Sequence, residues 1–210
     1  MRCHLALSIA SAVLLGAVPA AAEDAPASAA PDRATYITRE EIEAVSKAAP
    51  VGDQTLKVVD IGHENFAVGI VHRGKTVNGR SGDRDPNLVL PPPKPCGKRM
   101  TEAPEGGYPG GITLVSQTEG YYTTSGGGTV FTDGYIVNGD ENDLAELNGP
   151  TCLGRAYGVT VKTVKEGDVI VVPAGVVHGW IDVPDHVTYI SFRPSPGILE
   201  AGWEHPALKP

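Results

Sequence analysis

The sequence has little cysteine, little positive charge and no long apolar run after its first residues. Among 210 residues there are 3 cysteines, and 17 Lys and Arg side chains against 25 Asp and Glu give a formal net charge of -8. This acidic balance, without any Lys/Arg cluster, disfavours nucleic acid and anionic membranes as partners. A P-loop, a dinucleotide fingerprint and a nucleophile elbow are also absent in a suitable context, so the functions they mark are disfavoured.

The first residues are typical of a secretory signal peptide. Arg2 supplies a positive start, residues 5–18 are mostly apolar, and Ala20 to Ala22 form a small-residue cleavage site. The apolar stretch is shorter than the roughly 20 residues of a membrane-spanning helix. The sequence therefore predicts a signal peptide over 1–22, a secreted or periplasmic mature chain, and no membrane span after processing.

The mature chain fits a single domain. Residues 23–35 are rich in Ala, Pro and Asp without periodicity, which predicts a disordered leader. Residues 36–210 are long enough for one domain with its own core. Thr38 followed by Glu41 is a capping box, so a short helix is expected over 38–48.

Beyond that helix the pattern changes to short β-rich runs separated by turn residues. Such a pattern is typical of an antiparallel barrel or sandwich, so the expected fold class is all-β. Gly126 to Gly128 is expected to form the turn between two of these runs. The expected strands cover 55–61, 65–73, 111–115, 119–124, 129–137, 159–164, 168–172, 178–181 and 187–193.

Two long connections, 75–110 and 138–158, interrupt the strands, and connections of this length are usually functional lids or insertions. Each carries one cysteine of the mature chain, Cys96 and Cys152. An even pair in an oxidising compartment predicts a disulfide, with two unpaired thiols as the alternative. Such a bridge would tie the two insertions together over one mouth of the barrel.

Two motifs resemble those of the cupin superfamily. Gly167, Pro173, Gly175 and His178 match the second cupin motif, G-x5-P-x-G-x2-H. Upstream, Glu119 begins a match to the later half of the first motif, E-x6-G. The chain is particularly similar to small secreted single-domain cupins that read Thr-Glu-x-Tyr-Tyr at this place. The resemblance implies one jelly-roll-like antiparallel β-barrel around a small-molecule pocket, and cupins often pair into homodimers.

The resemblance is incomplete where metal-binding cupins carry their ligands. The His-x-His that precedes the Glu in those proteins is replaced here by Thr113 and Val115, or by Ile112 and Leu114 in the alternative spacing. Only two of the usual four ligands remain, and two protein ligands rarely hold a catalytic metal. No metal cofactor is therefore expected.

His72 provides the alternative, a divalent metal site. In the run 65–73 the period-2 face that contains Ile70 also contains His72, and this face is expected to line the barrel interior. His72, Glu119 and His178 would then offer two imidazoles and one carboxylate, the ligand set of many non-haem iron sites. A buried, hydrogen-bonded histidine is the other interpretation of His72.

The resemblance places Glu119, Tyr121 and His178 around one cavity, and these three are the candidate catalytic residues. Desolvation is expected to raise the proton affinity of the Glu119 carboxylate, which is how a general acid or base is tuned to neutral pH. Such a cavity suits a small, partly aromatic or unsaturated ligand. The candidate substrate-binding residues are His72, Thr123, Arg155 and Trp180.

Other interpretations stay open for several of these residues. Tyr121 and Trp180 are equally well explained as core packing. Arg73, on the strand face opposite His72, and Arg155, in an insertion, are candidates for binding a substrate carboxylate.

The sequence is therefore compatible with three functions. The first is a metal-independent lyase, isomerase or cyclase that acts on a small organic molecule with Glu119 and His178 as acid and base. The second is a non-catalytic small-molecule-binding protein. The third is a metal-dependent, oxygenase-type enzyme that uses His72 as the additional ligand.

Overall fold

The computed structural model describes residues 33–76, 94–144, 147–194 and 198–209. It is an all-β protein with one short α-helix and a 3-10 turn, so the predicted fold class is confirmed. The predicted signal peptide and nearly all of the predicted leader lie outside the described residues. No helix in the described ranges is long and apolar enough to cross a membrane.

The elements follow one another with short connections along most of the chain. The helices are α1 (Arg39–Ala48) and the 3-10 turn η1 (Pro206–Leu208). The strands are β1 (Gly52–Asp60), β2 (Asn65–Gly74), β3 (Lys94–Cys96), β4 (Tyr108–Leu114), β5 (Glu119–Thr132), β6 (Tyr135–Leu144), β7 (Gly149–Tyr157), β8 (Thr160–Lys165), β9 (Val169–Val172), β10 (His178–Asp182) and β11 (His186–Pro194).

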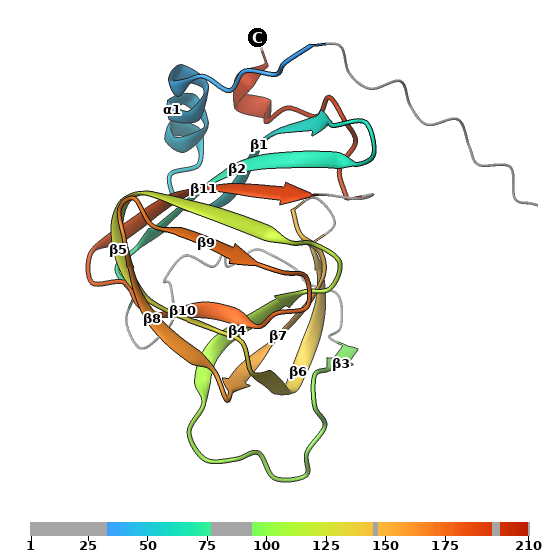
Figure 1. The fold of residues 1–210 in the computed structure, drawn as a ribbon, viewed down its shortest axis with the longest axis vertical. Coiled ribbons are helices and arrows are strands. Elements are labelled where there is room, and N and C mark those ends of the chain that lie inside the picture. Colours follow the sequence, from blue (N-terminus) through green and yellow to red (C-terminus); the bar gives the residue numbers. More distant parts are fainter. Residues whose placement is uncertain (1–32, 77–93, 145–146, 195–197, 210) are drawn as a thin grey trace, which may run out of the picture.

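One antiparallel sheet of 11 strands contains all of these strands, in the order β1-β2-β11-β5-β10-β4-β7-β6-β3, with β8 and β9 attached to β5. Strand β5 belongs to two halves, because its first part pairs with β9 and β11 and its later part with β8 and β10. In Figure 1 the strands of both halves curve around a common interior. Among the described strands β1 and β3 end the ladder without pairing to each other, so the expected closure into a barrel is not found.

Three consecutive glycines let β5 change partners without a turn. The turn predicted at Gly126 to Gly128 is wrong, because β5 runs unbroken through these residues. A Cβ atom at any of the three would collide with a backbone carbonyl oxygen, that of His186, Val164 or Asp182 respectively. Glycine is therefore required here for close approach of neighbouring strands.

The predicted insertion over 138–158 is also wrong. Most of it forms the antiparallel hairpin of β6 and β7, in which Glu141 pairs with Cys152. Polar residues such as Asp140 and Asn142 interrupt the alternation that would have marked a strand. In the other predicted insertion, 75–110, residues 77–93 lie outside the described residues, and the remainder contributes β3 and the start of β4.

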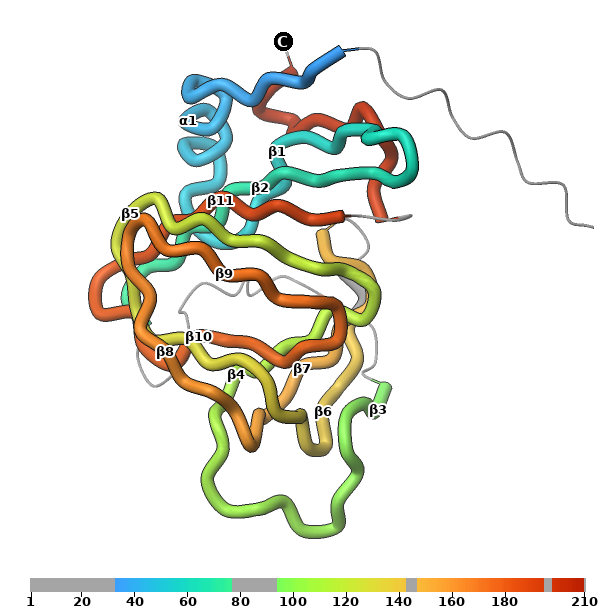
Figure 2. Tube along the Cα trace, in the orientation of Figure 1, coloured from blue at the N-terminus to red at the C-terminus, as the bar shows by residue number. Residues whose placement is uncertain are grey.

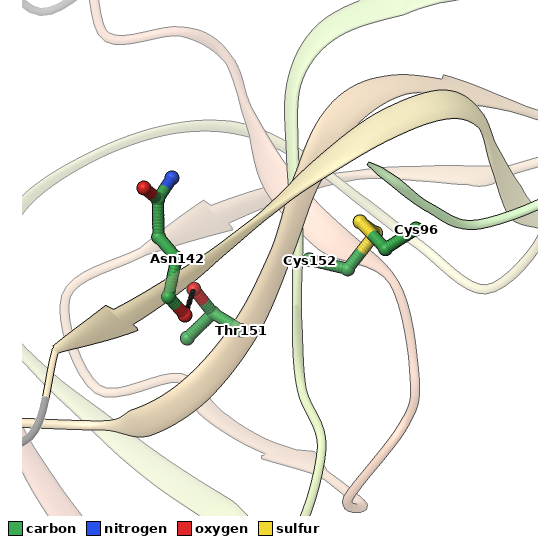
Figure 3. Close-up of a disulfide and its surroundings, with 4 residues drawn as sticks. All are labelled: Cys96, Asn142, Thr151 and Cys152. Carbon is green, nitrogen blue, oxygen red and sulfur yellow. Dashed lines mark hydrogen bonds between the residues drawn. A yellow bond between two sulfur atoms is a disulfide. The ribbon is translucent and has the colours of Figure 1, made fainter. Parts of the chain in front are cut away.

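The disulfide predicted between Cys96 and Cys152 is confirmed, with a Cα–Cα distance of 5.9 Å. It joins β3 to β7, as Figure 3 shows. A Cβ atom at Gly139 of the intervening strand β6 would lie 3.0 Å from the Cys152 sulfur, so the absence of a side chain there makes room for the bridge. Close by, Thr151 donates a hydrogen bond to the Asn142 carbonyl at 3.0 Å.

Helix α1 covers one face of β1 and β2. The predicted capping box is confirmed, because the Thr38 hydroxyl accepts from the Glu41 amide and the Glu41 carboxylate accepts from the Thr38 amide. Val45 then packs with Leu56 and Ile70 in a buried cluster. The C-terminal segment with η1 lies beside α1 and β1 in Figure 2, and its Leu208 joins the same cluster. We call this covered side of the sheet the outer face.

Candidate functional site

The face of the sheet opposite the outer face is called the inner face. On β5 this inner face carries the predicted site residues. Glu119, Tyr121 and Thr123 alternate along the strand with relative exposures of 2%, 8% and 1%, so they share one buried face as predicted. His178 begins β10, which pairs with the later part of β5. The bend of β5 therefore brings the imidazole from one half of the sheet to the carboxylate from the other.

Glu119, His178 and Tyr121 are in direct contact. The Tyr121 hydroxyl donates to Glu119 Oε2 at 2.5 Å, and His178 Nε2 lies 3.1 Å from the same oxygen. The Tyr121 hydroxyl and His178 Nε2 are 3.5 Å apart. One carboxylate oxygen thus lies between the phenol and the imidazole, and these two groups also lie close to each other.

Both ring nitrogens of His178 face oxygen atoms that accept hydrogen bonds. Nδ1 lies 3.1 Å from the Val176 carbonyl oxygen, and Nε2 lies on the Glu119 carboxylate. The ring of His178 is thus held between a backbone carbonyl and a carboxylate.

Arg193 belongs to this site, although the sequence patterns did not predict it. Its side chain is 1% exposed, its Nε donates to Glu119 Oε1 at 2.8 Å, and its Nη2 donates to Asp53 of β1. The alternation of β11 could have revealed it, because Arg193 follows Tyr189 at an even spacing and so shares its inward face. A chain of ion pairs from Asp53 through Arg193 and Glu119 to His178 therefore links β1, β11, β5 and β10.

This chain of ion pairs overturns the expectation that Glu119 has a raised proton affinity. Burial alone would raise the pKa of Glu119, but the hydrogen bond from His178, the charges of Arg193 and His178 and the hydrogen bond from Tyr121 lower it to about 2. Glu119 is therefore ionised at neutral pH. Conversely, burial and the Glu119 charge raise the pKa of Tyr121 well above its usual value, so the phenol keeps its proton.

Aromatic rings continue the site along the inner face. The Tyr121 ring lies 4.6 Å from that of Tyr189, and Tyr189 stacks on Trp180 at a centroid distance of 6.1 Å. These rings belong to one core cluster that also contains Val71 and Val187. Trp180 is half-buried and packs against this cluster, where it contacts Tyr189.

His72 does not reach this site. Val71 packs in the inner cluster with Tyr121, whereas Ile70 packs against α1 on the outer face. His72 lies on the Ile70 side, where its Nδ1 is 2.8 Å from the Thr188 hydroxyl and its ring stacks on His186. The prediction that this face lines the interior is wrong, because apolar alternation marks burial and α1 buries the outer face as well.

Arg155 does not reach the site either. Its side chain is exposed on β7, where Nη1 donates to the carbonyl oxygens of Gly106 and Gly107 at 3.3 and 2.8 Å. These bonds hold the loop that precedes β4. Arg155 therefore stabilises this loop and does not contact Glu119 or His178.

The residues around Glu119 do not fit a divalent metal. The donor set consists of one carboxylate and one imidazole, and three protein ligands are the norm for a catalytic metal. The carboxylate is already paired with the buried guanidinium of Arg193, a cation that would repel a metal ion. Within the described parts of the chain, no group of at least three His, Cys, Asp or Glu residues is arranged to hold a metal.

Comparisons with known proteins leave the family open. No protein-family model and no curated protein matches the chain. Among solved structures, the chain is similar to peruvianin-I, described as a cysteine peptidase from Thevetia peruviana latex, at 12% identity. The match covers 75% of this chain and 69% of that one with a TM-score of 0.29, which is too low to support any statement about fold or function.

Proposed function

We propose that this chain is an exported, cupin-type protein that performs metal-independent proton transfer on a small organic molecule, as a lyase, isomerase or cyclase. Tyr121 and His178 are the proton-transfer groups, and Glu119 holds them together. The observation that supports this proposal is the shared contact at Glu119 Oε2, which lies 2.5 Å from the phenol oxygen and 3.1 Å from the imidazole nitrogen.

The backbone of the second motif supports the cupin part of the proposal. Gly167 and Gly175 have φ angles of 88° and 79°, a region that favours glycine, so both positions need the residue the motif specifies. The motif forms β9, a turn and β10, and His178 is the first residue of β10. Export is supported by the disulfide, since disulfides persist mainly in oxidising compartments.

The geometry suggests a division of roles. Glu119 is ionised and fixed by Arg193, so it orients the imidazole ring of His178 rather than giving up a proton itself. Tyr121 and His178 both carry a proton toward the same oxygen. A proton lost from one of them to a substrate can be replaced from the other, which suits reactions that add a proton at one atom and remove it at another.

Hydrogen exchange tests the enzymatic proposal even when the product has not been identified. Small unsaturated and aromatic metabolites are incubated with the protein in deuterated water, and deuterium incorporation at carbon is followed by NMR. The wild type is expected to exchange one carbon-bound hydrogen of its substrate. Tyr121→Phe, His178→Gln and Glu119→Gln should each slow exchange by about 10²- to 10⁴-fold. His72→Ala, on the outer face, is the control and should exchange like the wild type.

A non-catalytic binding protein is the second candidate. One observation favours it, namely that both nitrogens of His178 and both carboxylate oxygens of Glu119 already have protein partners. A network satisfied in this way is stable without a substrate. This candidate predicts saturable ligand binding without any deuterium incorporation, and Glu119→Gln would then change affinity alone. Saturation without exchange would overturn the enzymatic proposal.

A further inference from the structure

Arg73 is a second guanidinium on the inner face. It precedes the last residue of β2 and pairs with Val187 of β11, a fully buried residue. Its Nε donates to the Tyr189 hydroxyl at 3.3 Å. Arg73 is therefore joined to the aromatic rings through Tyr189, whose ring lies 4.6 Å from that of Tyr121.

Arg73 lacks the carboxylate partners that Arg193 has. Arg193 pairs with both Asp53 and Glu119, whereas within the described ranges no carboxylate lies within ion-pair distance of Arg73. A guanidinium has five N–H donors, and the Tyr189 hydroxyl uses only the one on Nε. Because charged groups in an interior are normally paired, the half-buried Arg73 is suited to an anion supplied from outside the protein.

The aromatic rings near Arg73 indicate which kind of anion would fit there. The Tyr189 ring lies 4.6 Å from that of Tyr121 and 6.1 Å from that of Trp180, so Arg73, bonded to the Tyr189 hydroxyl, adjoins an aromatic cluster. Flat, unsaturated molecules stack well on such surfaces. The planar guanidinium in turn binds a carboxylate through two parallel hydrogen bonds.

We infer that Arg73 binds the carboxylate of the ligand, and that the substrate class is a small, flat, unsaturated or aromatic carboxylate whose other end reaches Tyr121 and His178. This inference rests on the proposed function for the place of the reaction. The binding itself is tested separately, because Arg73 acts on affinity and Tyr121 on proton transfer.

Calorimetric titration with benzoate, sorbate and cinnamate, each beside its neutral amide, tests the inference. At least one carboxylate should saturate the wild type at millimolar concentration, and its amide should bind much more weakly. Arg73→Ala should weaken carboxylate binding by about 10- to 100-fold, the range for hydrogen bonds to charged groups, with a smaller loss in Arg73→Lys. His72→Ala is the matched control, since His72 is adjacent in sequence but points to the outer face.

The outcomes separate this inference from the proposed function. If Tyr121→Phe binds the carboxylate like the wild type while Arg73→Ala does not, the anion site stands even when no deuterium exchange is found. If no carboxylate saturates the wild type, if acid and amide bind equally, or if Arg73→Ala binds as tightly as the wild type, the inference is overturned. Deuterium exchange of a neutral substrate would then leave the proposed function intact without it.

Discussion

The two halves of the sheet stabilise the protein in different ways. The half that contains β1, β2 and β11 buries charge on its inner face, where Arg193 pairs with Asp53 and Glu119, and packs α1 on its outer face. The half that contains β4, β6 and β7 buries an apolar cluster around Phe131 and fastens its short edge strand β3 with a disulfide.

The two halves differ in whether the candidate site residues also contribute to the free energy of unfolding. Buried ion pairs contribute little net stability compared with apolar packing, yet breaking one side of such a pair is costly. The charged half is therefore where a substitution at the site should also unfold the protein. In the half that contains β4, β6, β7 and the disulfide, substitutions can lower the stability of the protein without altering the candidate site.

The largest effect is expected from Arg193→Met. This change leaves the Asp53 and Glu119 carboxylates buried without their partner, so the free energy of unfolding should fall by about 3–5 kcal/mol. Denaturant titration of the purified protein measures it. The control is Arg39→Ala, which removes an exposed ion pair with Glu43 on α1 and should leave the denaturation midpoint nearly unchanged. Equal stability of the two variants would refute the importance of the buried pairs.

Removing the disulfide should weaken the half of the sheet that contains β4, β6 and β7. Cys96 and Cys152 are 56 residues apart in sequence, and a bridge that closes a loop of this length stabilises a protein by roughly 2–4 kcal/mol. The double variant with serine at both positions should lose this amount in denaturant titration. Carboxylate binding at Arg73 should persist in the folded fraction. A loss of binding with retained fold would show that the two halves are coupled.

Acid should weaken the charged half through Glu119. Its pKa is about 2 in the folded protein and near 4.5 when unfolded, so its ionised form adds stability above about pH 4.5. That stability, up to about 3 kcal/mol, should be lost as the pH falls from about 4.5 toward 2. Denaturant titrations across this range should show a smaller acid loss in Glu119→Gln than in the wild type. Parallel pH profiles would contradict the assignment.

The smallest effect is expected at the helix that covers the outer face. Thr38→Ala removes the hydroxyl that accepts from the Glu41 amide and should cost about 1 kcal/mol. The exposed Thr35, just upstream, gives the matched control Thr35→Ala, which should be neutral. Thermal unfolding resolves the difference. A Thr38→Ala midpoint equal to that of the control would show that the cap does not matter here.

Local rules predicted much of the fold. The capping box, the alternation of the strands and the even pair of cysteines each depend on neighbours in sequence or on a simple count, and each is confirmed. The shared face of Glu119, Tyr121 and Thr123 follows from the same alternation.

The failures arise where tertiary contacts decide. Both faces of β2 are buried, Val71 in the interior and Ile70 under α1, so alternation could not tell which face His72 would join. The proton affinity of Glu119 depends on Arg193, which lies 74 residues away. The glycines of β5 resemble a turn in sequence, because close approach between strands requires the same residue type as a change of direction.

The order of strands has a consequence for folding kinetics. Glu119 and Asp53 meet Arg193 across 74 and 140 residues of chain, and β11, which carries Arg193, is the last strand. Pairings this distant in sequence form slowly, because the entropy of closing long loops must be overcome first. Until β11 docks, the carboxylates of Asp53 and Glu119 lack their shared cation, so burial of the inner face before that step is unfavourable. The last of the described strands in chain order is thus the one that completes the site.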